Sequence, residues 1–556
     1  MKPDLVLLLL TLFVSSASPG IEPMVQFIDV TASTGIDFQY SNGATGDYHL
    51  PETLGSGGAF FDYNNDGHLD LYLINSGDLT HSDMVCRLYH NNGDGTFTDV
   101  TTESKMDSRG HYGQGVATGD YDNDGDVDLY RTNFRANHLY RNNGDGTFTE
   151  VGQQTSVADP SWSTSATFFD HDRDGYLDLY VVNYVDYSLT EAYPICYDGK
   201  IRSYCHPRFF QGVPDRLYRN NGDGTFDDIT ERAGIEDPGG SHHGKGLGVV
   251  AADFNNDRYP DIYVANDDTP NYLFLNNGDG TFLEIGTFTG AAYSGDGVAE
   301  AGMGVDAGDY NGDGFLDVFV TNFSYETNTL YHNNGDGTFS DVSYRAHLGE
   351  ESYLRLGFGT NFLDYDNDGD LDLFIANGHL SPSIEQSTDA VTYAQPDQLF
   401  QNNGNGTFTE TSPSAGSYFQ QKRVSRGSIM GDYDNDGDLD LVITTLNGAI
   451  LFLRNQQEDQ STGRANWLSL KTVGTVSNRD GIGTRLIFKI GSQQLIREVR
   501  TSASYLSSHD PRVLVGASSY QSIDRIEIHW PSGIRQALKD VPTNQHLKVV
   551  ENKIPD

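Results

Sequence analysis

The sequence predicts an all-β fold built from seven similar units, and two alternating motifs support this prediction. The first motif is an acidic nonapeptide, D-x-[DN]-x-D-G-x-x-D, and the second is NNGDGTF or a close variant. Each acidic motif precedes an apolar run such as LDLYVVN, which is typical of a strand. Each NNGDG run places Asn-Gly and Asp-Gly between apolar pairs, which is a strong hairpin signal. Each unit should therefore hold four strands, two flanking the acidic loop and two flanking the hairpin turn.

The spacing of the acidic motif predicts how the units are arranged. Four strands in a repeat of about 50–60 residues are typical of a β-propeller blade. The seventh unit lacks a hairpin and a fourth strand after residues 451–455. Residues 25–38 resemble the sequences of the fourth strands in other units, such as residues 97–106. We therefore predict a seven-bladed β-propeller over residues 24–456, closed by the N-terminal strand so that no sheet edge stays open between the first and last blades.

The acidic motif has the composition of a calcium loop. Calcium takes six to eight oxygen ligands, and carboxylates at alternate positions of a curled loop supply them. In the second copy the side chains of Asp120, Asp122 and Asp124 would bind at positions 1, 3 and 5, and Asp128 would close the shell at position 9. Gly125 at position 6 permits the bend. An EF-hand would instead close with Glu at position 12, where this copy has Arg131.

The predicted metal ligands occupy positions 1, 3, 5 and 9 of every copy. They are Asp62, Asn64, Asp66 and Asp70; Asp120, Asp122, Asp124 and Asp128; Asp170, Asp172, Asp174 and Asp178; Asp253, Asn255, Asp257 and Asp261; Asp309, Asn311, Asp313 and Asp317; Asp364, Asp366, Asp368 and Asp372; and Asp432, Asp434, Asp436 and Asp440. Asp, Asn and Gly also form simple turns, but seven copies with acids at positions 1, 5 and 9 favour up to seven Ca²⁺ sites. The fourth copy has Arg258 in place of glycine and Pro260 before its last Asp, so we expect it to bind poorly or stay empty.

The charge of the chain limits its partners. The formal net charge is −44, so the metal-free chain should repel itself, and calcium binding should be coupled to folding. Nucleic acid and anionic membranes both require basic patches, and neither is expected as a partner.

The N-terminus and the cysteines indicate an exported protein. Lys2, an apolar run over residues 5–14 and small residues up to Gly20 predict a secretory signal over residues 1–20. The run is short for a membrane span, so a secreted, periplasmic or cell-surface location is expected. Cys196 and Cys205 flank one loop, and a disulfide between them is expected in such a compartment. Cys86 is either a buried free thiol or pairs with another cysteine or a partner.

Two units carry insertions between their second and third strands, over residues 184–215 and 378–397. Long loops on a rigid scaffold often carry binding functions. Asparagine also recurs five residues after each of the first six closing Asp residues, at Asn75, Asn133, Asn183, Asn266, Asn322 and Asn377. These side chains either cap loop backbone, which we favour, or form a ring of amides that binds a polar ligand such as a glycan.

The pattern stops after residue 456. Residues 457–463 are a predicted linker, and residues 464–552 form a further β-rich unit. Its strings SNRDGIGTRL, VRTSASYLSSHDPRVLVG and IHWPSGIRQ resemble the ASPIC/UnbV domain. The repeats resemble FG-GAP/VCBS repeats, as in the propeller of integrin α-subunits. Together the chain resembles the cartilage acidic protein family in a short bacterial form without the EGF-like module, and this resemblance implies calcium ligands at positions 1, 3, 5 and 9.

Two functional hypotheses follow. The first is a secreted, calcium-binding interaction module of the adhesion type that binds extracellular protein or polysaccharide. The alternative is an enzyme acting at the central mouth of the propeller, in secondary-metabolite or carbohydrate chemistry. No strong catalytic signature is present, so no catalytic residue is assigned. Convergence of several candidate groups on one pocket would favour the enzyme: His242, His243, Lys245, Asp267, Asp268, Glu300, Arg355 and His379.

Overall fold

The computed structural model describes residues 25–80, 84–107, 109–191, 193–235, 244–457 and 464–552. The predicted signal segment, most of the predicted linker, His242 and His243 lie outside these residues. The described chain is all-β, with strands in ten sheets and a few single-turn helices. None of the described helices is long and apolar enough to cross a membrane.

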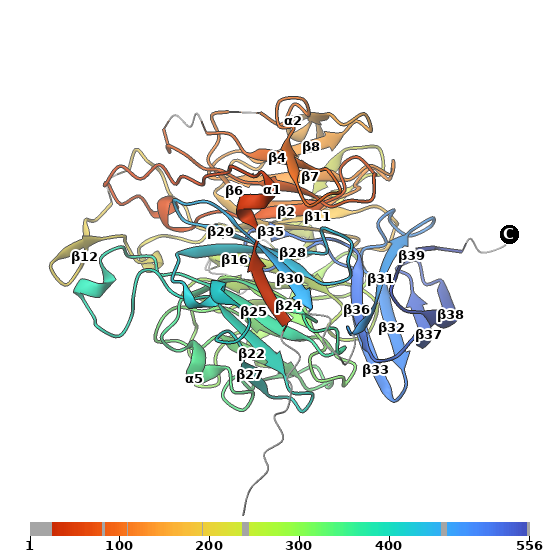
Figure 1. The fold of residues 1–556 in the computed structure, drawn as a ribbon. Coiled ribbons are helices and arrows are strands. Elements are labelled where there is room, and N and C mark those ends of the chain that lie inside the picture. Colours follow the sequence, from red (N-terminus) through yellow and green to blue (C-terminus); the bar gives the residue numbers. More distant parts are fainter. Residues whose placement is uncertain are drawn as a thin grey trace, which may run out of the picture.

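Each of the first six repeated units contributes four antiparallel strands in sequence order, as predicted (Figure 1), and in the first of them the first strand also pairs with a strand from the C-terminal part of the chain. The first three sheets contain β2 (Gly58–Phe61), β3 (Asp70–Leu73), β4 (Arg87–Asn91) and β5 (Phe97–Asp99); β6 (Gly113–Gly119), β7 (Asp128–Asn133), β8 (His138–Asn142) and β9 (Phe148–Glu150); and β10 (Ser163–Phe169), β11 (Asp178–Asn183), β14 (Arg216–Asn220) and β15 (Phe226–Asp228). The next three contain β16 (Gly246–Ala252), β17 (Asp261–Asn266), β18 (Tyr272–Asn276) and β19 (Phe282–Glu284); β20 (Val305–Gly308), β21 (Asp317–Val320), β22 (Thr329–Asn333) and β23 (Phe339–Asp341); and β24 (Gly357–Leu363), β25 (Asp372–Asn377), β26 (Gln398–Asn402) and β27 (Phe408–Glu410).

The seventh unit takes its fourth strand from the N-terminus. Its sheet contains β28 (Ser425–Gly431), β29 (Asp440–Thr445), β30 (Leu451–Gln457) and β1 (Val25–Asp29). β1 pairs antiparallel with β30, and Phe27 lies opposite Asn455. The sequence likeness of residues 25–38 to other fourth strands therefore corresponds to a real strand, which ends at Asp29 and is followed by a helical turn.

Short helical turns occupy the connections between these strands. They are α1 (Thr31–Thr34), α2 (Gly152–Thr155), α3 (Thr230–Ala233), α4 (Gly286–Thr289) and α5 (Gly349–Ser352), with 3-10 turns at Leu50–Thr53, Pro207–Phe209, Ile384–Gln386 and Ser417–Gln420. The first insertion carries a small hairpin, β12 (Cys196–Asp198) and β13 (Ile201–Ser203), beside the predicted disulfide between Cys196 and Cys205, which is present. Cys86 is a buried free thiol.

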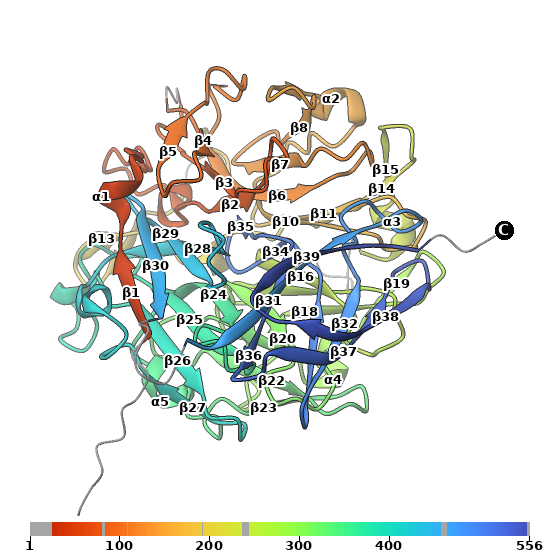
Figure 2. The same cartoon turned by 45° about the vertical axis from the view of Figure 1, so that its right-hand side comes forward.

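The first strands of the seven sheets surround a common centre in the described structure (Figure 2). Each lies beside the first strand of the following sheet, and β28 lies beside β2. An apolar cluster fills the space between each pair of neighbouring sheets; Val182 and Ile262, for example, lie in the cluster between the third and fourth. Both faces of a sheet are covered in this arrangement, which explains why the strands after the acidic loops are almost continuously apolar.

The C-terminal residues form two further sheets that lie against one side of the repeated sheets (Figure 1). One contains β36 (Val513–Ser518), β31 (Asn466–Val473) and β39 (Gln545–Val550), and the other contains β33 (Gln493–Glu498), β32 (Arg485–Ile490), β37 (Ser522–His529) and β38 (Arg535–Pro542). A separate core lies between them, and Leu468, Phe488 and Trp530 are fully or almost fully buried there.

A hairpin of the C-terminal domain enters the centre of the repeated sheets, which the sequence did not lead us to expect. It contains β34 (Ser502–Ala503) and β35 (Ser507–Ser508), and Ser508 pairs with Ala59 of β2. Tyr505 and Leu506 at its tip are completely buried in a cluster of residues from several sheets. We call residues 502–508 the plug, because they fill the centre around which the first strands lie.

Candidate metal loops

The acidic loops share one backbone geometry. In every described copy the Oδ2 atom of the Asp at position 1 accepts the N–H of position 6 at 2.8–3.1 Å. In the first loop, Oδ1 of Asp62 also accepts the N–H of Asp66 at 3.0 Å. These bonds curl the chain around the carboxylate of position 1 and turn the side chains of the alternating positions toward one space.

The closing Asp at position 9 is anchored from the third strand of its sheet. Asp70 is completely buried, and its Oδ1 atom accepts the N–H of Asn91 at 2.8 Å. The same bond recurs in the other six loops at 2.8–2.9 Å. This anchor leaves Oδ2 of the closing Asp as the oxygen that faces the loop.

The first asparagine of the NNGDG motif connects neighbouring sheets, a role that we had not predicted. The Nδ2 atom of Asn142 donates to the carbonyl of Tyr63, at position 2 of the preceding loop, at 2.8 Å. The Asn side chains in the corresponding positions repeat this bond at 2.7–2.9 Å: Asn91, Asn220, Asn276, Asn333, Asn402 and Asn455. Asn91 of the first sheet bonds to Tyr433 of the seventh, so the series of bonds is cyclic. The hairpin turn itself forms as predicted.

Burial and crowding make the loops electrostatically unfavourable without a cation. Burial, together with nearby acids, raises the pKa of Asp70, Asp120 and Asp170 to about 8 in each case. Carboxyl groups in this state would take up protons near neutral pH unless a positive charge compensates them. A divalent cation between the carboxylates would supply that charge.

The residues present fit a hard divalent cation. Oδ2 of Asp317, Oδ1 of Asp364 and Oδ1 of Asp434 are buried and lack a hydrogen-bond partner in the described chain, and such atoms normally have one. The second, third, sixth and seventh loops each bring three carboxylate oxygens within 4.8 Å of one another: Asp120, Asp122 and Asp128; Asp170, Asp172 and Asp174; Asp364, Asp366 and Asp372; Asp432, Asp434 and Asp440. A calcium ion bound there would neutralise and cross-link the loop.

Three loops differ in composition. The first, fourth and fifth carry Asn at position 3, so each presents one carboxylate fewer. In the fourth loop, Arg258 adopts a φ of +79°, and its N–H still bonds to Asp253 at 2.8 Å. The arginine therefore leaves this hydrogen bond of the turn intact, and the weak binding expected from Arg258 and Pro260 stays a prediction.

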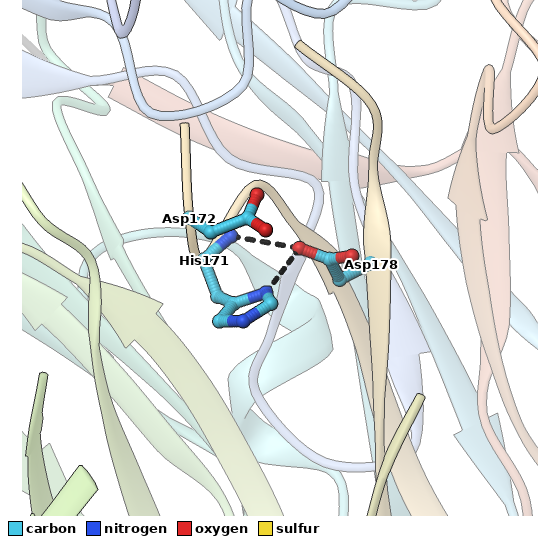
Figure 3. Close-up of side chains that lie close together, drawn as sticks. All are labelled: His171, Asp172 and Asp178. Atoms are coloured by element: carbon cyan, nitrogen blue, oxygen red, sulfur yellow. Dashed lines mark hydrogen bonds and ion pairs between the residues drawn. The ribbon is translucent and has the colours of Figure 1, made fainter. Parts of the chain in front are cut away.

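The third loop has a histidine within its acidic cluster. His171 lies at position 2, and its Nδ1 atom is 2.5 Å from Oδ2 of Asp178 (Figure 3). Oδ2 of Asp178 also accepts the N–H of His171 at 2.9 Å. Ligand atoms of His171, Asp172 and Asp178 all lie within 4.8 Å of one another. This residue was missed in the sequence, although its position is occupied by Tyr or Phe in the six other copies.

The C-terminal domain docks on the face that carries the acidic loops. Oδ2 of Asp480 accepts the N–H of Asp120 at 2.8 Å, and the N–H of Gly516 donates to Oδ2 of Asp364 at 2.8 Å. Arg497 donates to the carbonyl of Gly369 at 2.8 Å. A Cβ atom on Gly516 would lie only 2.3 Å from the backbone of Asn367, so the two domains are in close backbone contact.

The plug bonds to several sheets at once. The N–H of Thr360 donates to Oγ of Ser504 at 2.9 Å, and the Tyr505 hydroxyl donates to the carbonyl of Leu54 at 3.1 Å. The hydroxyls of Thr118 and Ser508 are 2.8 Å apart. The plug therefore occupies the centre, and its tip reaches an apolar cluster that includes Phe134 and Trp162.

The asparagines that follow the closing Asp residues cap loop backbone, which confirms the interpretation that we favoured. All six are at most 3 % exposed. Each donates from Nδ2 to a carbonyl of a neighbouring loop; Asn183, for example, bonds to Pro214 at 2.9 Å. Buried amides with backbone partners are not available to read a glycan.

The candidate catalytic groups do not gather in one described pocket. The N–H of Asp267 donates to the carbonyl of Lys245 at 2.9 Å, and burial raises the pKa of Asp267 to about 7. Glu300 lines a different cavity of about 510 Å³. His379 is buried against Phe323, and burial lowers its pKa to about 4.

The two remaining candidates near these groups are on the surface side. Asp268 lies 3.4 Å from His206 of the first insertion, and Arg355 is half-buried. Of the six described groups, Lys245, Asp267 and Asp268 are therefore neighbours, whereas the other three lie in separate environments.

Comparison with known sequences agrees with the repeated loops and the docked domain. The FG-GAP-like repeat model matches residues 62–131, 120–181, 210–264, 253–320, 309–375 and 364–443. The chain belongs to the FG-GAP-like repeat family. Residues 474–555 of this FG-GAP-like protein match the ASPIC and UnbV model, as the motifs had indicated.

Curated relatives of this FG-GAP-like protein carry the name cartilage acidic protein 1. The human protein is 26 % identical over 329 residues, which are 57 % of this chain and 46 % of the relative. The Xenopus tropicalis protein is 26 % identical over 294 residues, which are 52 % and 42 % of the two chains. The chain thus spans about half the length of the curated relatives that it matches.

Two solved structures show weak likeness to this FG-GAP-like protein. An Agrocybe aegerita lectin that recognises non-reducing terminal N-acetylglucosamine has 19 % identity and a TM-score of 0.39, with coverage of 71 % of this chain and 87 % of the lectin. YCF48 from Cyanidioschyzon merolae has 9 % identity and a TM-score of 0.38, with coverage of 73 % and 97 %. Neither likeness carries an inference about this chain.

Proposed function

We propose that this chain is an extracellular interaction module whose seven-bladed propeller, closed by β1, is held together by calcium. The observation that carries this proposal is the cyclic set of bonds from the NNGDG asparagines to the preceding loops. Calcium at positions 1, 3, 5 and 9 would fix each loop, and each loop would then hold the next blade. Residues 24–456 would form the propeller and residues 464–552 the docked ASPIC/UnbV domain, joined by a linker at 457–463.

The face opposite the acidic loops is the better candidate for a partner surface. The C-terminal domain covers the loop face, and the tip of the plug lies in the same apolar cluster as Phe134 and Trp162. The first insertion borders a cavity of about 640 Å³ with Phe134, Trp162 and Tyr187 in its lining. Aromatic side chains beside polar loop groups suit both polysaccharides and protein side chains. We propose this cavity as part of the surface that binds an extracellular protein or polysaccharide.

An exported location is consistent with the disulfide and the sequence relatives. The Cys196–Cys205 bond requires an oxidising compartment to persist, and the relatives are named for cartilage. Extracellular calcium modules work at roughly 10⁻⁴–10⁻³ M, a concentration range that fits the proposed location. The proposed signal at residues 1–20 would direct the chain there.

The enzymatic alternative has weaker support. Lys245, Asp267 and Asp268 form the closest grouping among the candidates, and Glu300 and His379 lie in other environments. A propeller enzyme acting at the central mouth would need a substrate site there, whereas the plug fills the centre with Tyr505 and Leu506. We therefore keep the interaction module as the conclusion.

The proposal is tested first with a chelator. EGTA should lower the melting temperature of the purified protein markedly, and added calcium should restore it, because the carboxylates of the loops repel one another without the cation. Atomic emission should count up to seven calcium ions per chain. A melting curve that is indifferent to EGTA and to millimolar calcium would refute the calcium assignment.

The partner surface is tested by binding to immobilised matrix polysaccharides and surface proteins in the presence of calcium. Tyr187→Ser should abolish the binding that the unmodified chain shows, since Tyr187 lines the cavity. Tyr520→Ser is the matched control, because Tyr520 is an exposed tyrosine of the C-terminal domain. Equal loss in both variants, or retention in both, would contradict the proposed surface.

A further inference from the structure

The third acidic loop differs from the six others in one side chain that touches its carboxylates. Position 2 holds His171 there, and an aromatic residue elsewhere: Tyr63, Tyr121, Phe254, Tyr310, Tyr365 and Tyr433. The aromatic residues pack between neighbouring sheets, as Tyr121 does against Phe226 with ring centroids 5.5 Å apart. Phe254 shows that this packing requires no polar atom. The ring nitrogens of His171 are therefore not needed for packing and are able to serve as metal ligands.

The imidazole of His171 is fixed in position. The side chain is 1 % exposed, and its ring stacks on Phe282 of the next sheet with centroids 6.2 Å apart and an angle of 30° between the planes. Phe169 lies on another side, with centroids 6.3 Å apart. This packing directs Nδ1 toward the carboxylates and not toward the solvent. A ligand held in place before the metal arrives loses little freedom on binding.

Three ligand atoms of different side chains converge beside this ring. Nδ1 of His171 lies 2.5 Å from Oδ2 of Asp178, the oxygen that faces the loop. Figure 3 shows the carboxylate of Asp172 on the same side as that oxygen. All three ligand atoms lie within 4.8 Å of one another, a separation that one cation can bridge with only small side-chain movements.

An arginine also pairs with two carboxylates of the third loop. Arg219 donates from Nε to Asp172 and from Nη2 to Asp174, at 2.7 Å in both cases. This arginine offsets part of the negative charge that draws a hard cation such as calcium. Calcium prefers oxygen ligands alone, whereas imidazole suits zinc, copper, iron and nickel.

We propose that the third loop binds a divalent first-row metal cation, such as Mn²⁺, Co²⁺ or Zn²⁺, through His171 Nδ1 together with Asp172 and Asp178. The inference rests on the proposed function only in assuming that the loops bind divalent cations. The other loops, which offer oxygen at these positions, retain calcium. The protein would then hold two classes of metal in one ring of repeats.

Two other histidines near the loops provide natural controls. Nδ1 of His90 is 3.1 Å from Asp70, and Nδ1 of His332 is 3.0 Å from Asp317. Both contact Oδ1, the oxygen already bonded to the N–H of the third strand, and not Oδ2. They also lie at the partly exposed edge of the loop. These imidazoles therefore hold the closing Asp in place, and we expect neither of them to bind a metal ion.

The test uses the full chain saturated with calcium at about 1 mM, to which Mn²⁺ is added before dialysis. The unmodified protein should retain one Mn²⁺ per chain, and pulsed EPR should detect a coupled ¹⁴N nucleus. His171→Phe, which copies Phe254 of the fourth loop, should lose the ¹⁴N coupling and bind Mn²⁺ at least ~10-fold more weakly. Its calcium-dependent melting should be unchanged.

The control variant is His332→Gln, which copies the residue at Gln401 in the sixth sheet. It should keep both the retained Mn²⁺ and the ¹⁴N coupling. Coupling that persists in His171→Phe would overturn the assignment of His171, as would calcium-loaded wild-type protein that retains no nitrogen-coupled Mn²⁺. A melting temperature that does not respond to calcium would instead show that the general calcium proposal fails, so the two failures can be told apart.

Discussion

Replacing Leu506 by alanine tests whether the plug makes the C-terminal domain and the repeated sheets one unit. Leu506 belongs to the C-terminal domain in sequence, yet it is completely buried in a cluster with Leu54, Leu247 and Phe358 of the repeated sheets. Leucine-to-alanine changes at such sites cost roughly 2–5 kcal/mol, depending on how far the cavity collapses. The surrounding residues come from several rigid sheets and cannot close in together, so we expect a loss of about 3 kcal/mol.

The alanine variant isolates packing from backbone strain. Leu506 has a φ of +56°, a conformation that costs an L-residue roughly 1–2 kcal/mol. Alanine keeps the Cβ atom and therefore the same strain, so the whole change reports the lost side-chain contacts. Leu506→Gly would mix this loss with relief of strain and is the less informative variant.

The assay is hydrogen exchange measured by mass spectrometry in calcium, because it resolves the stability of separate segments. Strands β2, β6 and β24 should become less protected along with the plug, since they share its cluster or its hydrogen bonds. Val550→Ala serves as the control, because Val550 is 47 % exposed and should change little. Faster exchange confined to residues 502–508, with all repeated sheets unaffected, would refute the reasoning.

Three further predictions concern single sites. Asp440→Asn should remove one calcium ion per chain in a calcium titration and lower the unfolding free energy in a urea melt by roughly 1–3 kcal/mol. The control Asp94→Asn, in an exposed turn, should change neither value. Burial raises the pKa of Asp397 to about 6. The contribution of this carboxyl group to the free energy of unfolding is complete below pH 4 and declines as the pH rises through 6, by about 1.4 kcal/mol between pH 5 and 7. Asp397→Asn should abolish this decline in urea melts. Cys196→Ser should cost at most about 3 kcal/mol and speed exchange only within residues 184–215; faster exchange throughout the sheets would contradict the local role.

The elements that the sequence predicted well are those set by local chemistry. Asp120 and Asp128 lie in one short loop whose geometry depends on neighbouring residues, so a single motif is enough to place them. Glycine at position 6, as at Gly125 with a φ of +98°, is required by the same local turn. The strand at Val25–Asp29, which pairs with β30, could be found because the repeat supplies six other examples of what a fourth strand looks like.

The elements that escaped prediction depend on partners far away in the chain. Asn91 bonds to Tyr433, 342 residues later, and its motif also has an obvious local use as a hairpin turn. The sequence did contain a signal for this second role, because Asn455 keeps the asparagine in the seventh unit, where no NNGDG turn follows. The plug was harder, because Tyr505 and Leu506 are two apolar residues among serines, a pattern typical of an ordinary loop.

Two arginines of the C-terminal domain lie beside the acidic loops and bond to the backbone of those loops. Arg485 and Arg497 donate to the carbonyls of Gly314 and Gly369, both at position 6, at 2.6 and 2.8 Å. Because these guanidinium groups bond to the loop backbone, the ligand oxygens of the carboxylates remain available to a metal. Oδ1 of Asp364, for example, is buried without a hydrogen-bond partner in the described chain even though Arg497 is nearby.

Arg497 and a metal would therefore act on the sixth loop together and not as substitutes. Arg497 is itself in a buried setting, and burial lowers its pKa while the surrounding carboxylates oppose that effect. Without calcium, the carboxylates either stay charged and repel one another or take up protons. Protonated carboxyl groups would no longer supply the negative field that stabilises Arg497. Calcium loss should thus weaken the docking of the C-terminal domain as well as the loops.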